Sequence, residues 1–154
     1  MNVIIIYSTI YGHNLEMSQF IHDKILPDST LISMDNFTPV NLANYDLIIM
    51  CPCTYGEGQL TTNEEAFYHY LTKCCLTGSD YLIVGVGDKH FGPRKFANAV
   101  SIFAEKLAAA GASSITHPLK VDYDEAKLVQ KRVNKIINNY YQKKGLTLPI
   151  NTTM

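Results

Sequence analysis

Long apolar runs without alternation constrain the fold of this chain more than any other feature. Residues 2–7, 45–51 and 80–86 consist mostly of apolar side chains. A strand with one face in water would alternate apolar and polar residues, so these runs predict strands buried on both faces, as in a parallel sheet. With 154 residues, the chain has the size of one domain.

Segments with a helical pattern separate the apolar runs. We expect helices at about 15–26, 62–77, 94–110 and 124–143, and two further strands at 30–34 and 114–122. Thr62 or Asn63 would cap the second helix, Gly111 would end the third, and Pro118 suits 114–122 to a sheet edge. Strands that alternate with helices predict an α/β fold, a parallel sheet with right-handed crossovers.

Three unusual loops follow the first, third and fourth expected strands. They span residues 8–14, 53–60 and 87–93. In a parallel sheet the carboxyl ends of the strands meet at one edge, where ligands bind, so the three loops should cluster there.

The first loop has the chemistry of an anion site. Hydroxyls of Ser8, Thr9 and Tyr11 precede a glycine bend and open into a helix, whose first N–H groups favour an anion. His13 is its one possible cation. The loop matches neither the dinucleotide fingerprint nor the Lys-containing loop of nucleotide hydrolases. A capping turn that binds nothing is the alternative.

The second loop, Cys53–Leu60, suits a flat, redox-active ligand. Tyr55 supplies a stacking surface, Gly56 and Gly58 permit unusual backbone shapes, and Glu57 adds a carboxylate. An ordinary turn between a strand and a helix is the alternative.

Charge and cysteine spacing exclude several other classes. A formal net charge of −1 gives no bulk argument for nucleic acid or a membrane. The N-terminus does not resemble a signal peptide, and no apolar run would span a bilayer. We therefore expect a cytoplasmic protein with reduced cysteines. Cys51, Cys53, Cys74 and Cys75 lack zinc spacing, so no metal site is expected.

The loops resemble those of the flavodoxin family. Thr9–Asn14 stands where flavodoxins carry a Thr/Ser-x-Thr-Gly-x-Thr phosphate loop, although its Tyr-Gly-His core also resembles flavodoxin-like quinone oxidoreductases. Thr54–Gly58 is similar to the flavin loop of flavodoxins and diflavin reductases. Gly85–Asp88 with Phe91 and Phe96 resembles their third loop, Gly-x-Gly-Asp-x-x-Tyr/Phe. The fifth strand shows no insertion, as in short-chain flavodoxins.

The resemblance implies a three-layer sandwich in which helices cover both faces of a five-stranded parallel sheet. The strand order 2-1-3-4-5, with FMN at the switch point, is that of flavodoxin itself and comes with the resemblance. It implies one FMN-binding domain over residues 1–144 and a C-terminal tail over 145–154.

The resemblance also implies that FMN lies among the three loops. Its phosphate would sit in the first loop and its ring between Tyr55 and Phe91, with His90 as the alternative stacking residue. The peptide after Tyr55 would flip at Gly56, and its carbonyl would accept a hydrogen bond from the one-electron-reduced flavin. The expected FMN contacts are Ser8, Thr9, Ile10, Tyr11, Gly12, His13, Asn14, Cys53, Thr54, Tyr55, Gly56, Glu57, Gly58, Gly87, Asp88, His90, Phe91 and Gly92.

The resemblance therefore implies a low-potential one-electron carrier that cycles between semiquinone and hydroquinone and has no catalytic residues of its own. Its partners would be a reductase that donates electrons and an enzyme that accepts them, and it would be a monomer. Two alternatives stay open: an FMN-dependent NAD(P)H:quinone reductase, and a non-redox regulatory domain on the same fold.

Overall fold

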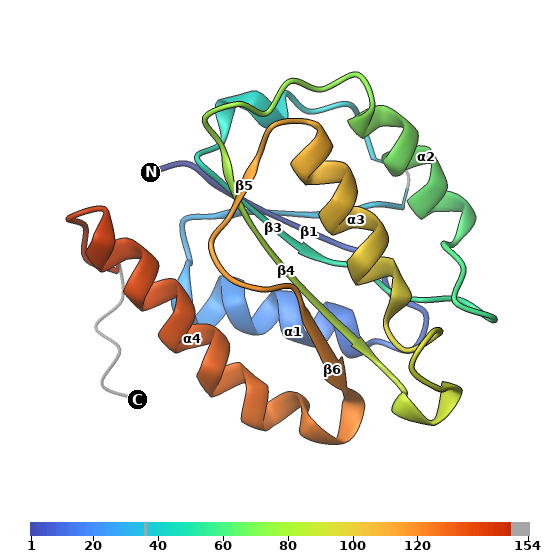
Figure 1. The fold of residues 1–154 in the computed structure, drawn as a ribbon. Coiled ribbons are helices and arrows are strands. Elements are labelled where there is room, and N and C mark those ends of the chain that lie inside the picture. Colours follow the sequence, from blue (N-terminus) through green and yellow to red (C-terminus); the bar gives the residue numbers. More distant parts are fainter. Residues whose placement is uncertain (36, 149–154) are drawn as a thin grey trace.

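The computed structural model describes residues 1–35 and 37–148. Within them, strands and helices alternate along the chain (Figure 1). The strands are β1 (Val3–Tyr7), β2 (Thr30–Ser33), β3 (Leu47–Cys51), β4 (Asp80–Gly87), β5 (Ser113–Ser114) and β6 (Leu119–Asp122). The α-helices are α1 (His13–Phe20), α2 (Thr62–Leu71), α3 (Asn98–Ala109) and α4 (Ala126–Lys143).

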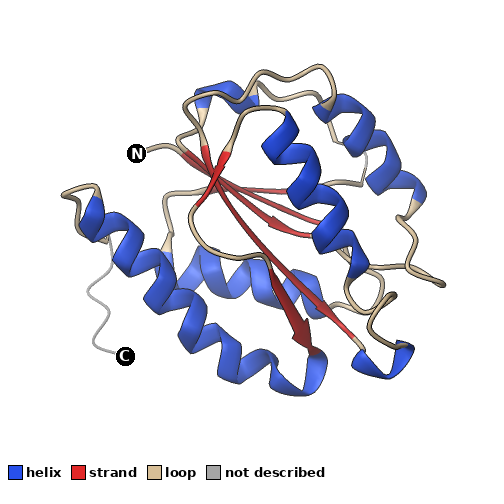
Figure 2. Cartoon of the chain, viewed as in Figure 1, coloured by secondary structure: helices blue, strands red, loops and turns tan. Residues whose placement is uncertain are grey.

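The strands form one parallel sheet in the order β2-β1-β3-β4-β5, and β6 also pairs with β4 (Figure 2). In the register of the central strands, Ile5 of β1 lies beside Ile49 of β3 and Leu31 of β2. The expected strand order is confirmed, and so is the three-layer architecture.

Helices cover both faces of the sheet, with α1 and α4 on one side and α2 and α3 on the other (Figure 1). Successive strand residues point to opposite faces, so Ile5 packs with the α1 and α4 cluster, whereas Ile4 packs with the α2 and α3 cluster. Both residues are fully buried. Burial on both faces explains why the strand sequences are continuously apolar.

The fifth strand differs from the expected single segment at 114–122. It is split into β5 and β6, and both pieces run parallel to β4. Pro118 lies in the interruption, where its ring nitrogen has no hydrogen to donate to a neighbouring strand. The expected extent was therefore wrong, while the place beyond β4 was right.

The cap of one helix and the start of another also differ from the expected ones. Thr61, not Thr62 or Asn63, caps α2: its Oγ1 accepts a hydrogen bond from the Glu64 N–H, and Glu64 reaches back to the Thr61 N–H. This reciprocal pair is a capping box. Helix α3 begins at Asn98 rather than near 94, because Ala97 before it adopts a left-handed φ of 45°.

Helix α1 begins within the first loop, at His13, and its last turn, Ile21–Ile25, is a π-helix. At the other end of the chain, α4 stops at Lys143 and the Leu146 N–H donates to the Tyr141 carbonyl. Leu148 packs against the core, so residues 145–148 of the expected tail lie on the domain, and 149–154 are outside the described residues. In the described part of the chain, no helix is long and apolar enough to cross a bilayer.

Candidate functional site

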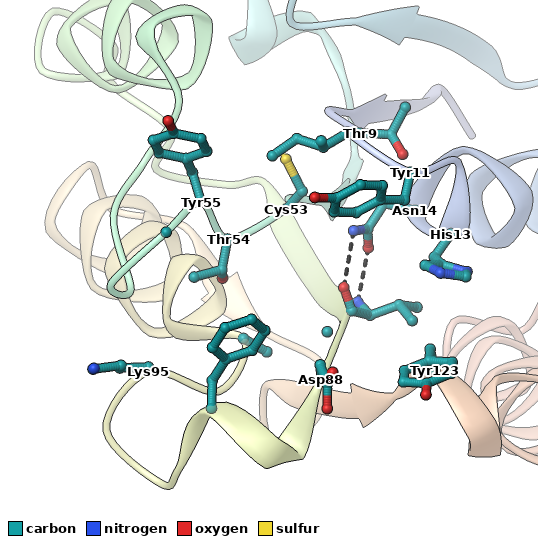
Figure 3. A pocket seen from close by; sticks show the side chains of 16 residues that line it. Thr9, Tyr11, His13, Asn14, Cys53, Thr54, Tyr55, Asp88, Lys95 and Tyr123 are labelled. Carbon is teal, nitrogen blue, oxygen red and sulfur yellow. Dashed lines mark hydrogen bonds between the residues drawn. The ribbon is translucent and has the colours of Figure 1, made fainter.

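The three loops surround one cavity of about 550 Å³ at the carboxyl ends of the strands (Figure 3). This is the edge of the sheet at which the sequence predicts them to cluster. Twelve of the eighteen expected site residues line the cavity: Thr9, Ile10, Tyr11, His13, Asn14, Cys53, Thr54, Tyr55, Gly56, Gly87, Asp88 and Phe91.

Six expected residues do not line it: Ser8, Gly12, Glu57, Gly58, His90 and Gly92. Ser8 and Gly58 are buried behind the wall. Glu57 pairs with Lys95 on the outside of the loop. His90 is exposed and its ring Nδ1 lies 2.8 Å from Asp88 Oδ1, whereas Phe91 lines the cavity.

Four lining residues were missed by the sequence reasoning: Val86, Lys95, Ala97 and Tyr123. Val86 is a strand residue, and Lys95 and Ala97 belong to a third loop that continues past residue 93. Tyr123 directly follows β6, so its place could have been inferred, because the end of the fifth strand also reaches this edge.

The first loop is shaped around the start of α1. Gly12 precedes the helix with φ of 90°, which favours glycine, and its N–H donates to Thr9 Oγ1 at 2.8 Å. The Glu16 N–H donates to the Gly12 carbonyl at 2.9 Å, which makes Glu16 the first residue of α1 with that intrahelical bond. The earlier N–H groups of the turn have no intrahelical acceptor, and together with the helix dipole they favour an anion.

Asn14 joins this loop to β4. It is 2% exposed, its Oδ1 accepts from the Val86 N–H at 2.8 Å, and its Nδ2 donates to the Val86 carbonyl at 3.1 Å (Figure 3). The Asn14 carboxamide thus makes the two backbone hydrogen bonds that a neighbouring strand would otherwise make with Val86 of β4. Asn14 lines the cavity while both of its polar side-chain atoms bond to the backbone of β4.

The second loop is a tight turn that also binds to α3. Tyr55 exchanges two backbone hydrogen bonds with Gln59, at 2.7 and 2.8 Å, and its carbonyl also accepts from the Gly58 N–H. Gly56 lies within the turn with φ of 50°, as expected for a glycine there. Thr54 Oγ1 accepts from the Ala99 N–H at 3.0 Å.

The Tyr55 carbonyl therefore points into the turn. Rotating the peptide after Tyr55, as the resemblance implies, would break its bonds to Gly58 and Gln59. Each such bond contributes about 0.5–1.5 kcal/mol, so new contacts would have to replace them for the rotated state to be populated.

Aromatic rings stand around the mouth of the cavity. Tyr55 is 55% exposed and Phe91 60% exposed, which leaves both rings free to cover a flat ligand. Tyr123 stacks on His13, with ring centroids 5.6 Å apart (Figure 3). Tyr11 stands across the cavity from Tyr55 and is still more exposed.

The charges at the mouth are largely balanced. Glu57 forms an ion pair with Lys95, which links the second loop to the third. Hydrogen bonds from the His90 backbone and ring lower the pKa of Asp88. Burial, followed by the nearby Glu64, raises the pKa of the Cys53 thiol to about 12, so the cavity wall carries a neutral thiol there.

The chain is similar to known flavodoxins in sequence and in fold. The Flavodoxin family model matches residues 5–135. A flavodoxin of Synechocystis sp. is 28% identical over 133 residues, which cover 80% of this chain and 75% of the relative. The fold also matches flavodoxin 2 of Bacillus cereus, with a TM-score of 0.79, 24% identity and coverage of 90% of this chain and 99% of that one.

The flavodoxin of Fusobacterium nucleatum, solved with flavin mononucleotide bound, matches with a TM-score of 0.78 at 17% identity, over 95% of this chain and 99% of that one. The family model covers most of the chain, and the strand order 2-1-3-4-5 is that of the flavodoxin fold. The chain belongs to the flavodoxin family.

Proposed function

We propose that the cavity binds FMN and that the chain carries electrons between other proteins. One observation supports this most directly: two exposed aromatic side chains, Tyr55 and Phe91, flank a cavity that also reaches the start of α1. A flat ring and a phosphate, joined in one molecule, match these two features. The family assignment and the FMN-bound Fusobacterium flavodoxin point the same way.

Each loop would hold one part of the cofactor. Thr9, Tyr11 and His13, with the first N–H groups of α1, would bind the phosphate through mostly neutral donors. Tyr55 and Phe91 would cover the ring and exclude water from it. When bound, FMN supplies one-electron chemistry at low potential.

The two alternatives, a quinone reductase and a non-redox regulatory domain, are not favoured. A quinone reductase needs a place for a nicotinamide and a quinone beside the flavin, and a regulatory domain needs no flavin site. The relatives and the matched structures described above are flavodoxins, and the family assignment covers most of the chain.

The redox partners would dock over the cavity mouth, because that is where the ring edge would be reachable. We propose a donor reductase and an acceptor enzyme, a monomeric carrier, and a cytoplasmic location. We also propose that residues 1–144 act as the FMN-binding domain.

A reconstitution experiment tests the central proposal. The purified chain is stripped of any flavin and titrated with FMN, while the quenching of flavin fluorescence reports binding. The loaded protein is then reduced stepwise without oxygen, and its visible spectrum is recorded.

We expect stoichiometric FMN binding and reduction in two separate one-electron steps. Binding followed by a single two-electron step would favour the quinone reductase. The carrier proposal would be wrong if FMN does not co-purify with the protein and its fluorescence is not quenched in the titration.

A further inference from the structure

A buried carboxyl group lies directly behind the cavity wall. Glu64, in the first turn of α2, is fully buried. Its Oε2 accepts from Ser8 Oγ at 2.5 Å and from the Cys53 N–H at 3.0 Å. Its Oε1 accepts from the Thr61 N–H at 2.9 Å. One side chain thus contacts three separate segments.

Two of these segments begin the cavity loops. Ser8 follows β1 and precedes Thr9, while Cys53 follows β3 and lines the cavity itself. Ser8 Oγ also accepts from the Cys53 N–H at 3.2 Å and lies 3.4 Å from Cys53 Sγ. Glu64 and Ser8 therefore bridge the starts of the first and second loops.

A helix cap alone does not require this arrangement. The Thr61 hydroxyl and the Thr61 N–H complete the capping box, and they use only Oε1 and the backbone of Glu64. Oε2 is directed at the two loops instead. A buried carboxyl is costly to desolvate, so three donors around it indicate a defined arrangement of the loops rather than a chance contact.

We propose that Glu64 is a positioning residue of the FMN site, because it joins the loop after β1 to the loop after β3 and sets their spacing. The proposal rests on FMN binding as the proposed function. Without this link the Cys53 N–H loses its acceptor on Glu64 and the Ser8 hydroxyl loses the carboxyl oxygen to which it donates, so the two loops sample spacings that do not fit one ligand. The apparent affinity for FMN is then the intrinsic affinity multiplied by the fraction of molecules whose loops remain correctly spaced.

The main test compares FMN affinity among four variants. Glu64→Ala removes the whole link and Ser8→Ala removes half of it. Thr61→Ala weakens the same helix cap but leaves the bonds of Glu64 to Ser8 and Cys53, and Glu65→Ala removes an exposed neighbouring carboxylate.

We expect FMN affinity to fall about tenfold or more in Glu64→Ala and less in Ser8→Ala, as if about nine molecules in ten lost the binding arrangement. The two controls should stay within about twofold of the parent protein. A purely structural role would instead give Thr61→Ala and Glu64→Ala the same affinity wherever their thermal stability is the same, and that result would overturn the proposal.

Glu64→Gln provides a second test, which can still be made if Glu64→Ala does not fold. The Gln carbonyl oxygen can accept from both Ser8 Oγ and the Cys53 N–H, while its NH₂ group can no longer accept from Thr61. We therefore expect affinity within about threefold of the parent. An affinity as weak as that of Ser8→Ala, in a folded Gln variant, would contradict the joining role.

Hydrogen exchange in the chain without FMN separates this proposal from the proposed function. We expect the Cys53 amide to exchange about tenfold faster in Glu64→Ala or Ser8→Ala than in the parent. Unchanged exchange would overturn the link even if FMN binds. Faster exchange in a protein that does not bind FMN would overturn the proposed function and leave the link intact.

Discussion

Single buried polar side chains fix the positions of the cavity loops. Asn14 bonds to the backbone of Val86, and Glu64 bonds to Ser8 and Cys53. Asp122, 3% exposed, accepts from the Lys89 N–H of the third loop at 3.0 Å. Buried polar groups need partners, so each of these side chains specifies where a distant loop must lie.

The pKa of Glu64 gives a prediction for stability. Burial raises this pKa above its ordinary value and outweighs the hydrogen bonds from Ser8, Thr61 and Cys53 that lower it. Besides burial, Glu64 in turn raises the pKa of the neighbouring Cys53 thiol. The folded chain then holds the proton on Glu64 more tightly than the unfolded chain. The stabilisation from this group is complete below the ordinary Glu pKa and is lost as pH rises through the raised value.

Urea unfolding across this pH range checks the sign. Glu64→Gln should show a smaller decrease in unfolding free energy with rising pH than the parent protein, and Glu65→Gln should follow the parent. Equal slopes in Glu64→Gln and the parent would show that Glu64 titrates alike in the folded and unfolded chains.

The aromatic rings of the mouth carry a prediction for ligand affinity. Tyr55→Ala and Phe91→Ala each remove a stacking surface, which contributes about 0.5–1.5 kcal/mol beyond buried area, so each should weaken FMN binding about tenfold. Tyr55→Phe and Phe91→Tyr keep the ring and serve as controls in the same fluorescence titration. If an alanine variant binds as its control does, that ring does not cover the flavin.

At the scale of elements, the ends of helices and strands depend on tertiary contacts. The C-terminal part of α4 is attached to the start of β4, because Tyr140 Oη donates to Asp80 Oδ2 at 2.7 Å and Lys144 Nζ lies 3.4 Å from the same oxygen. The pattern of apolar residues in α4 predicts which face packs inward. It does not show that a tyrosine hydroxyl on that face would meet a carboxylate.

Tyr140→Phe tests the attachment of α4. Loss of the hydroxyl removes one hydrogen bond to a charged group, so the free energy of unfolding should fall by about 1.5–3 kcal/mol in urea denaturation. Tyr141→Phe is the matched control, because Tyr141 is the next residue and packs in the same core; it should change stability less. Similar losses in both variants would mean that ring packing alone holds this end of α4.

For the molecule as a whole, exposed apolar groups gather at the cavity mouth and charge does not. In the described part of the chain, five of the eight exposed large hydrophobic side chains line the cavity: Ile10, Tyr11, Tyr55, Phe91 and Tyr123. The formal net charge is −1, and Glu57 and Asp88 both have cationic or histidine partners. Contact area rather than long-range attraction should therefore dominate docking.

Small redox probes of opposite charge test this balance. The FMN-loaded, reduced protein is oxidised by an anionic cyanoferrate complex and by a cationic ruthenium ammine complex at low and high salt. We expect rates that change less than about threefold with salt for both probes, because the chain contributes a formal net charge of only −1 and the FMN phosphate would be the main charge left to screen. Opposite, large salt effects for the two probes would reveal a charged docking surface.

The apolar runs and the spacing of the loops were enough to predict the parallel sheet and the clustering of the three loops, whereas the three layers and the strand order came with the resemblance to flavodoxins. Local patterns predict these features because burial on two faces and helical periodicity both determine which residue types follow one another within a short window of sequence. The split of the last strand into β5 and β6, the cap at Thr61 and the cavity position of Tyr123 needed the structure.

Only the tertiary structure decided which polar side chains face the ligand and which hold the frame. The sequence places Ser8 and Asn14 among the expected FMN contacts and does not single out Glu64. Folding buries all three and gives each of them at least one partner 45 to 72 residues away, as in the bonds of Ser8 to Cys53, of Ser8 to Glu64 and of Asn14 to Val86. A sequence pattern describes neighbours along the chain, whereas the partner of a buried polar group is set by contacts between distant segments.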